Sequence, residues 1–406
     1  MKTGIRLSEL VVLAFFPLAG LAQEEQGFAD TTPWIRHTID NTSLGSDGTK
    51  TADVNGDGKL DLAVGWEEGG VARLYLQPAD PRQPWPYVEV PAPDVEDAFA
   101  ADLDGDGQMD LITCSEGDHQ RVTIHWAPAD PEKYLDSKAW RSEDIPVTLG
   151  TTRWMFGRAV DVDGIHGLDL LVGSKDPNGT VGWLEAPVDP RNMEGWVYHE
   201  ISPAGWIMSI EWVDMNGNGT PDVLITDRKG SLRGLRWFEN PGASGVRGAW
   251  RPHLLGVRSG EPMFLGLEPD TGASPQAIVV ADLLGGWTQF YRQGKQWLWE
   301  QQAYPEGLGT RGKSALLTDL DQDGKMDLVL SFEGALGKSG LAALMDFRSD
   351  SPGLLDISGA AGVKYDFVTA IDLDGDGDLD LVTSEETAAD GSKKGLGVIW
   401  YENPLK

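Results

Sequence analysis

Short apolar runs bounded by turn residues recur along the whole chain. One kind of run leads into an acidic loop, as in residues 367–371, and a second leaves such a loop, as in residues 61–66. A third ends in an aromatic residue and a proline turn, as in 182–187, and a fourth begins with tryptophan and alternates, as in 196–201. Runs of this length and pattern predict β-strands. Four short strands in each repeat of about fifty residues are typical of a propeller blade.

An acidic loop separates the first strand of a repeat from the second. In residues 372–381, aspartate stands at positions one, three, five and nine, and Gly377 stands at position six. Carboxylates at alternating positions of a tight loop converge on one centre, and a backbone carbonyl at position seven completes a set of oxygen ligands suited to Ca²⁺. The pattern matches the first half of an EF-hand loop, but Thr383 occupies position twelve and a strand follows. We therefore expect calcium loops in a β setting.

The spacing of the loops sets the number of repeats. Loops begin at Asp53, Asp102, Asp161, Asp214, Asp319 and Asp372, at intervals of 49, 59, 53, 105 and 53 residues. The interval of 105 spans two repeats, because residues 268–280 have strand character without the loop ligands. Seven repeats follow.

The predicted fold is all-β, a seven-bladed β-propeller of four-stranded blades over residues 33–406. The last strand in the sequence has the pattern of the third strand of a blade. The first strand after the amino-terminal segment, residues 33–40, has the pattern of a fourth strand. We therefore predict that residues 33–40 pair in the last blade, built by residues 364–403, and close the ring, which protects its edges. An open-ended solenoid is the alternative architecture.

Five loops have complete ligand sets, and we predict about five Ca²⁺ sites. The sets are Asp53, Asn55, Asp57, Lys59 and Asp61; Asp102, Asp104, Asp106, Gln108 and Asp110; Asp214, Asn216, Asn218, Thr220 and Asp222; Asp319, Asp321, Asp323, Lys325 and Asp327; and Asp372, Asp374, Asp376, Asp378 and Asp380. The loop at Asp214 has only two formal charges, so we expect weaker binding there. The loop from Asp161 to Asp169 has Ile165 at position five and loses a ligand. We expect all of these ions to stabilise turns rather than to take part in a reaction.

The loops, in particular residues 53–62 and 372–381, resemble those of the FG-GAP/VCBS repeat family, the calcium propellers of integrin-α type. The resemblance covers residues 33–406, and residues 397–404 are similar to a sequence segment of secreted bacterial VCBS-repeat proteins. It implies a calcium-binding propeller. Family members include adhesion receptors, lectin-like proteins and, more distantly, carbohydrate lyases, so the resemblance implies the fold and the metal but not the function.

The net charge of the chain excludes one class of partner. The net charge is −31, and the loops hold close to a third of the 64 acidic residues. A chain this acidic is unsuited to nucleic acid, whose binding needs a basic face.

Residues 1–22 resemble a secretory signal peptide, with a basic flank, an apolar core at 10–18 and a small-residue cleavage site, followed by a linker at 23–32. A buried strand or a short membrane anchor is the alternative.

We therefore expect an exported protein that is secreted, periplasmic or held at the cell surface, and that is not an integral membrane protein. Cys114 is the only cysteine of the sequence, so no intrachain disulfide can form. Bound calcium would supply stability in its place.

A binding site is expected on the face opposite the calcium loops. In a four-stranded blade the first and third connections share one face, and positions shortly before each innermost strand sample the other face near the axis. Cations and aromatic residues gather at those positions, which suits a polar ligand. The predicted axial pocket consists of Arg153, Trp154, Trp206, Arg228, Lys313, Lys364, Tyr365 and Asp366. A solvated charged rim is the alternative.

Three functions fit these observations. The first is a binding protein whose partner on that face is a saccharide or a protein. The second is a sugar or polysaccharide lyase, in which Arg153, Arg228 and Lys364 neutralise charge and Tyr365 or His119 removes the proton. The third is a purely structural surface scaffold. No hydrolase, zinc-protease or phosphate-loop motif occurs, so the sequence predicts no defined catalytic residues.

Overall fold

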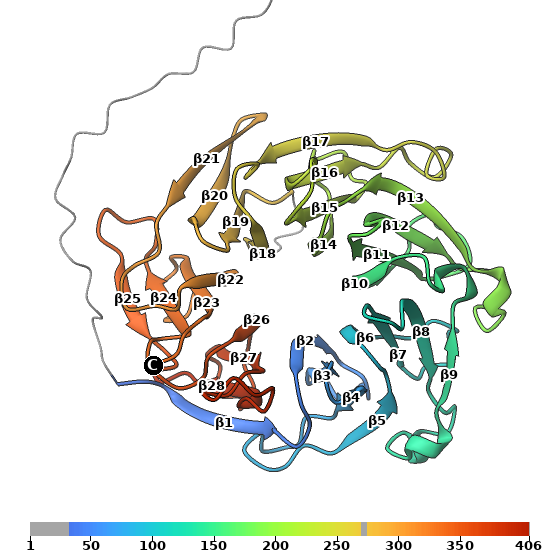
Figure 1. The fold of residues 1–406 in the computed structure, drawn as a ribbon, viewed down its shortest axis with the longest axis horizontal. Helices are drawn as coiled ribbons and strands as arrows, with labels where there is room; N and C mark the ends of the chain where they lie inside the picture. Colours follow the sequence, from blue (N-terminus) through green and yellow to red (C-terminus); the bar gives the residue numbers. More distant parts are fainter. Residues whose placement is uncertain (1–31, 269–273, 406) are drawn as a thin grey trace, which may run out of the picture.

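Seven four-stranded antiparallel sheets surround a central axis in a computed structural model, which describes residues 32–268 and 274–405 (Figure 1). Each sheet is a blade whose first strand lies nearest the axis and whose fourth strand lies at the outer rim. The predicted seven-bladed, all-β propeller is confirmed. The predicted signal peptide, residues 1–22, and residues 23–31 of the linker lie outside the described residues.

The blades follow one another along the chain. Blade 1 contains β2 (Ser46–Ala52), β3 (Asp61–Trp66), β4 (Val71–Tyr75) and β5 (Tyr87–Pro91). Blade 2 contains β6 (Val95–Ala101), β7 (Asp110–Ser115), β8 (Arg121–Trp126) and β9 (Arg141–Asp144). Blade 3 contains β10 (Arg153–Val160), β11 (Asp169–Lys175), β12 (Thr180–Glu185) and β13 (Val197–Pro203). Blade 4 contains β14 (Ile207–Val213), β15 (Asp222–Asp227), β16 (Gly234–Glu239) and β17 (Arg251–Gly256).

The remaining blades complete the ring. Blade 5 contains β18 (Pro262–Leu267), β19 (Ala277–Asp282), β20 (Gly286–Gln293) and β21 (Gln296–Gln302). Blade 6 contains β22 (Arg311–Thr318), β23 (Asp327–Glu333), β24 (Leu341–Met345) and β25 (Gly353–Asp356). Blade 7 contains β26 (Tyr365–Ile371), β27 (Asp380–Glu385), β28 (Gly397–Glu402) and β1 (Ile35–Asp40).

The amino-terminal strand closes the ring as predicted. β1 pairs antiparallel with β28, and Ile35 lies opposite Glu402. The same strand also joins blade 7 to blade 1, because the Asp40 carboxylate accepts hydrogen bonds from Arg73 at 2.5 Å and from the Tyr75 hydroxyl at 2.7 Å. β1 therefore covers the edge of β28 and connects blade 7 to blade 1.

The core consists of apolar layers between adjacent blades. The second strand of a blade is buried along its whole length, as β7 is, because neighbouring blades cover both of its faces. This explains why these strands appear in the sequence as continuous apolar runs rather than as alternating ones. Outer strands alternate, since only one of their faces is covered, as in β5.

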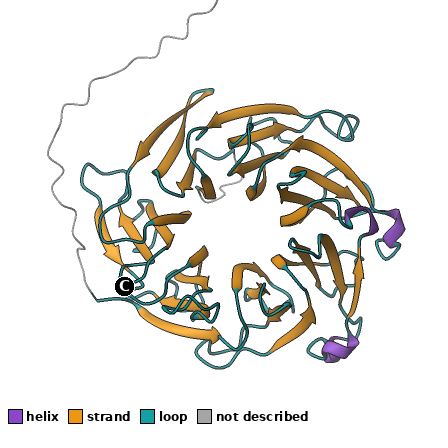
Figure 2. Ribbon diagram, viewed as in Figure 1, coloured by secondary structure: helices purple, strands orange, loops and turns teal. Residues whose placement is uncertain are grey.

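The topology places the acidic loops and the proline turns on one face, since they are the first and third connections of each antiparallel blade. Short helical turns such as η1 (Pro131–Lys133), η2 (Ser137–Ala139) and η4 (Met193–Gly195) occur in the third connections, at the outer rim (Figure 2). No helix in the described part of the chain is long and apolar enough to cross a membrane.

Candidate functional site

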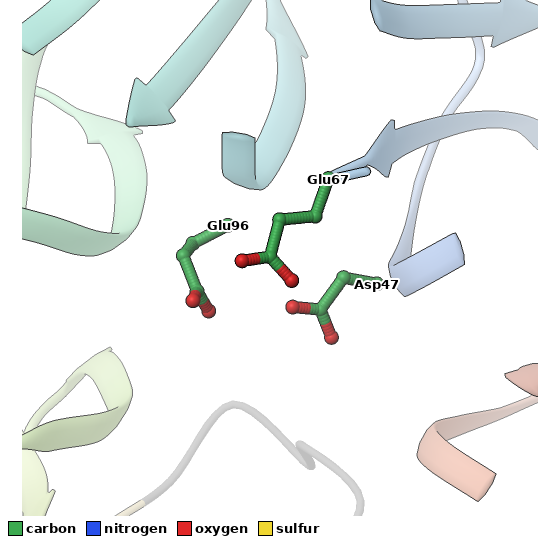
Figure 3. A group of neighbouring side chains, drawn as sticks. All are labelled: Asp47, Glu67 and Glu96. Carbon is green, nitrogen blue, oxygen red and sulfur yellow. The ribbon is translucent and has the colours of Figure 1, made fainter. Parts of the chain in front are cut away.

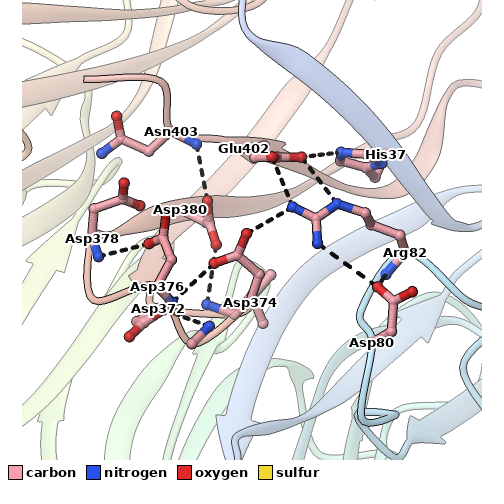
Figure 4. Close-up of polar contacts among 12 residues, drawn as sticks. His37, Asp80, Arg82, Asp372, Asp374, Asp376, Asp378, Asp380, Glu402 and Asn403 are labelled. Atoms are coloured by element: carbon pink, nitrogen blue, oxygen red, sulfur yellow. Dashed lines mark hydrogen bonds and ion pairs between the residues drawn. The ribbon is translucent and has the colours of Figure 1, made fainter. Parts of the chain in front are cut away.

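The acidic loops are closed by their own backbone. In the loop of blade 7, Asp372 accepts hydrogen bonds from the backbone N–H groups of Gly375 at 2.9 Å and Gly377 at 3.1 Å (Figure 4). Gly377 has φ of 93°, a left-handed conformation that glycine adopts without a steric penalty. This wrapping turns the side chains at alternating positions toward one centre.

Carboxylates from positions one, three and nine converge in several loops. In blades 2, 3 and 6 their oxygens lie within 4.8 Å of one another, in the groups Asp102, Asp104 and Asp110; Asp161, Asp163 and Asp169; and Asp319, Asp321 and Asp327. Such groups could hold a metal ion, and their all-oxygen chemistry fits Ca²⁺. The blade 3 loop keeps this convergence although His166 replaces the usual glycine at position six, with φ of 66°.

The aspartate at position nine has a second role, which the sequence reasoning missed. Asp380 is buried, and its two oxygens accept backbone N–H groups from Leu373 at 3.1 Å and Asn403 at 2.9 Å. The same pair of bonds recurs at Asp61, Asp110, Asp169, Asp222 and Asp327. Burial raises the pKa of Asp380 to about 7. The residue therefore ties the acidic loop to the end of the third strand.

Arginines connect some of these loops to the next blade. Arg82, from the third connection of blade 1, lies 2.7 Å from Asp374 in the blade 7 loop and 2.7 Å from Glu402 on β28 (Figure 4). Equivalent contacts join Arg191 to Asp104 and Arg247 to Asp163, each at 2.5 Å. We call these three contacts the arginine clamps. They too were missed, although an arginine stands shortly before the outer-strand tryptophan in each of those repeats.

Two predicted axial residues do not face the channel. Trp154 is buried, and its indole N–H donates to Thr148 at 3.1 Å. Tyr365 is also buried; its hydroxyl donates to the Ala361 carbonyl at 2.6 Å and lies 2.8 Å from that of Tyr401. The prediction that they line a pocket is wrong, because both side chains pack into the apolar layers between blades.

The role of Tyr365 as a base is wrong for the same reason. Burial, together with Tyr401, raises the pKa of its hydroxyl well above the ordinary value. The other proposed base, His119, is exposed and its Nδ1 lies 2.8 Å from Asp94. No described contact joins it to the cations Arg153, Arg228 or Lys364.

Most of the cations predicted to lie near the axis form ion pairs with acidic side chains. Lys313 lies 3.2 Å from Glu333 and 3.5 Å from Asp366, and Arg228 lies 2.8 Å from Glu261. Lys364 pairs with Glu386. Arg153 is exposed and has no ion pair within the described part of the chain. The cationic cluster expected from sequence is therefore a ring of ion pairs, which we call the axial ring.

Three carboxylates near the axis, from blades 1 and 2, also lie close together. Asp47 on β2, Glu67 after β3 and Glu96 on β6 bring oxygens within 4.8 Å of one another (Figure 3). Burial raises the pKa of Glu96 to about 8, against the effect of Lys175 at 3.5 Å. Burial and the neighbouring Asp366 raise the pKa of Asp47 well above its usual value. These acids were not among the predicted ligand-binding residues, because the sequence reasoning selected the cations.

Trp206 is the aromatic group that the structure does bring to the axial ring. Its indole ring is half-buried, and three cations lie over it, with Lys175 at 4.3 Å from the ring centre and Arg228 and Lys229 each at 4.5 Å. Cations at this distance are attracted to the negative face of an indole ring. Of the eight predicted axial residues, Trp206, Arg228, Lys313, Lys364 and Asp366 thus lie in contact with the charged network.

The comparisons with known proteins agree with the fold. The model of the FG-GAP-like repeat matches residues 30–113, which span β1, the whole of blade 1, β6 and most of β7. A search of curated proteins finds no significant match. The loop of blade 1 lies inside the matched segment, and its hydrogen bonds recur in blades 2, 4 and 7. The match to an FG-GAP-like repeat and the seven-bladed ring together support an FG-GAP repeat family for this chain.

Proposed function

We propose that this FG-GAP propeller is a calcium-stabilised binding protein that takes a saccharide at the axial ring, on the face opposite the acidic loops. The observation that carries the proposal is the convergence of charged side chains from most blades on the axis. Lys175 and Arg228 offer donors, Asp47, Glu67 and Glu96 offer acceptors, and Trp206 offers an apolar ring. Donors, acceptors and an aromatic surface together suit a ligand rich in hydroxyl groups.

A lyase receives less support than a binding protein. Neutralising a developing negative charge needs a free cation. Arg228 and Lys364 are each already bonded to a carboxylate, which leaves Arg153 alone of the three without an ion pair among the described residues. Tyr365, the first choice of base, is buried. A protein partner or a purely structural scaffold would leave the axial ring without a small ligand.

Saccharide binding is tested by titrating the purified protein with a panel of neutral oligosaccharides and following heat or intrinsic fluorescence. Arg153 is exposed at the start of the innermost strand β10 and has no ion pair with a described residue. The variants Arg153→Glu and Glu67→Gln should each weaken binding without lowering the melting temperature. Binding that is unchanged in both variants would remove the axial ring as the site.

The proposal includes Ca²⁺ in the five complete loops that begin at Asp53, Asp102, Asp214, Asp319 and Asp372, with the loop at Asp161 as a weaker sixth site. Support comes from the converging oxygens and from the donor chemistry of the loops. Each site held at a calcium concentration a hundred times its Kd would add about 2.7 kcal/mol to stability. Melting in calcium and in EDTA tests this; equal melting temperatures would refute it.

Export is part of the proposal, supported by the signal-like residues 1–22 and by the abundance of calcium outside cells. FG-GAP repeats are typical of extracellular proteins. Fractionation of the producing cell and sequencing of the mature amino terminus test the prediction. A mature chain that begins near residue 23 is expected, and an intact Met1 in the cytoplasmic fraction would refute it.

A further inference from the structure

A groove of about 610 Å³ runs between blades 4 and 5, on the same face as the axial ring but farther from the axis. Its walls are β17, the segment 257–261, the turn between β19 and β20, and β21. The volume is that of a typical small-molecule site. Its inner end is Glu261, the partner of Arg228 in the axial ring.

One wall presents an exposed aromatic ring beside polar groups. Trp299 is 56 % exposed, whereas the repeated outer-strand residues Trp196 and Trp250 are buried. The strand register puts Trp299 opposite Phe290 and Gln301 opposite Thr288, so that all four side chains lie on one face of blade 5. An indole ring packs well against the C–H face of a sugar ring, while an amide and a hydroxyl can bond its hydroxyl groups.

Two arginines in the groove have no acidic partner. Neither Arg233 nor Arg258 lies in an ion pair with any residue that the structure describes, in contrast to the paired cations of the axial ring. Among the described residues, their guanidinium groups make long hydrogen bonds to the carbonyls of Gly260 and Ser231, each at 3.4 Å. In a chain with a net charge of −31, two such arginines in one groove favour an anionic ligand. The planar guanidinium group matches a carboxylate best.

The floor of the groove contains a carboxylate that is incompletely bonded. Asp282 is 2 % exposed, and its Oδ1 accepts the backbone N–H groups of Leu284 at 3.2 Å and Gly285 at 2.7 Å. Its Oδ2, which lies against Gly260, has no hydrogen-bond donor among the described residues. Buried polar atoms are nearly always bonded, so this acceptor indicates a place for a donor such as a hydroxyl group.

The segment beside it is strained. Val257 has φ of 59°, a left-handed conformation that is a genuine outlier for a β-branched side chain. Strain of this kind gathers at ligand sites, where the surrounding structure maintains it. The groove also adjoins blade 5, the one repeat whose sequence lacks the acidic-loop ligands.

We propose that the groove between blades 4 and 5 binds an acidic saccharide, an oligosaccharide that contains uronic acid. A pyranose ring packs on Trp299, the uronate carboxylate bonds Arg233 and Arg258, and hydroxyl groups bond Gln301 and Asp282. The inference goes beyond the proposed function, because it concerns a second site whose residues and ligand charge differ from those of the axial ring.

The test uses the full, calcium-loaded protein and isothermal titration with trigalacturonate and with its neutral counterpart galactotriose. We expect trigalacturonate to bind at least ten times more tightly than galactotriose. Trp299→Ala and the double variant Arg233→Gln/Arg258→Gln should each weaken trigalacturonate at least tenfold. Arg251→Gln is the matched control, since Arg251 lies on β17 outside the groove and is largely exposed; it should bind as the parent does.

Each opposite result overturns the inference. Absence of trigalacturonate binding by the parent protein would do so, as would equal binding of the two trisaccharides or unchanged binding in both groove variants. Loss of trigalacturonate binding in Arg153→Glu alone would assign the acidic sugar to the axial ring, and would leave the proposed function intact while removing the groove. Melting curves of every variant should match the parent, because the substituted side chains lie at the surface of the groove.

Discussion

Replacing Lys313 with methionine removes one charge from the interior of the axial ring and leaves the side-chain volume almost unchanged. The ammonium group lies 3.2 Å from Glu333 and 3.5 Å from Asp366, and both Lys313 and Asp366 are buried. Removing one member of a buried ion pair leaves the other charge uncompensated, at a cost of about 3–5 kcal/mol. For a propeller of this length the unfolding entropy is about 0.8 kcal/mol per kelvin, so Lys313→Met should lower the melting temperature by about 4–6 °C.

The loss should depend on pH in a defined direction. Burial opposes ionisation of Asp366, but Lys313, a hydrogen bond with Asp47, the charge of Lys364 and the backbone N–H of Phe367 together outweigh it and lower the pKa of the carboxyl to about 2. A folded-state pKa below the unfolded value contributes stability above about pH 4, and that contribution disappears as the pH falls toward 2. In the variant the lowering by Lys313 is lost and burial weighs more heavily, so this pKa rises and the carboxyl becomes neutral at a higher pH. The difference between parent and variant should therefore be largest near pH 7 and shrink toward pH 4.

Differential scanning calorimetry of both proteins between pH 4 and pH 8 measures this. Lys133→Met is the control, because Lys133 is largely exposed and its pair with Asp130, at 3.4 Å, should contribute little. A variant that melts with the parent at pH 7 would refute the reasoning. So would a difference that stays constant across the range, since it would indicate lost side-chain contacts rather than an uncompensated charge.

Three further predictions follow from other parts of the ring. Cys114 is buried, and burial raises the pKa of its thiol, so a thiol reagent at pH 8 should label it only after unfolding in urea; rapid labelling of the native protein would contradict its placement. Arg191→Gln removes a clamp to Asp104, and because Arg191 is partly exposed we expect a loss of at most about 1 kcal/mol in urea unfolding, greater at low salt; a loss insensitive to salt would argue against an ion pair. Deleting residues 1–40 removes β1 and exposes the edge of β28, so the shortened protein should melt lower and self-associate in size-exclusion chromatography; a monomer with the parent's melting temperature would show that β1 is dispensable.

The fold was predictable because the acidic loop tolerates few changes. Six loops keep aspartate at positions one and nine and a left-handed residue at position six, which is a glycine such as Gly377 in all but blade 3, so their spacing counts the blades. The phase of the strands then predicted that residues 33–40 pair in blade 7, as the register of β1 with β28 confirms.

The axial ring was only partly predictable, because its contacts join distant parts of the sequence. Counting from the loop identified the positions of Lys313 and Asp366, but not that they form an ion pair across two blades. Trp154 and Tyr365 directly follow the counted positions Arg153 and Lys364, and both are buried, because successive side chains of a strand point to opposite faces. The arginine clamps were not predicted for a similar reason, because their partners are distant in the sequence: Arg82 and Asp374 are 292 residues apart.

The position of β1 has a consequence for the order of events during synthesis. His37 on β1 bonds Glu402 on β28, and 365 residues separate them. At roughly 5–20 residues per second, β1 is complete about 20–70 s before its partner strand exists. Blades 1 to 6 each form from one continuous segment, so they can assemble in turn as the chain emerges. β1 is thus made before the other described strands but is among the last to pair, because β28 must be synthesised before blade 7 can close the ring.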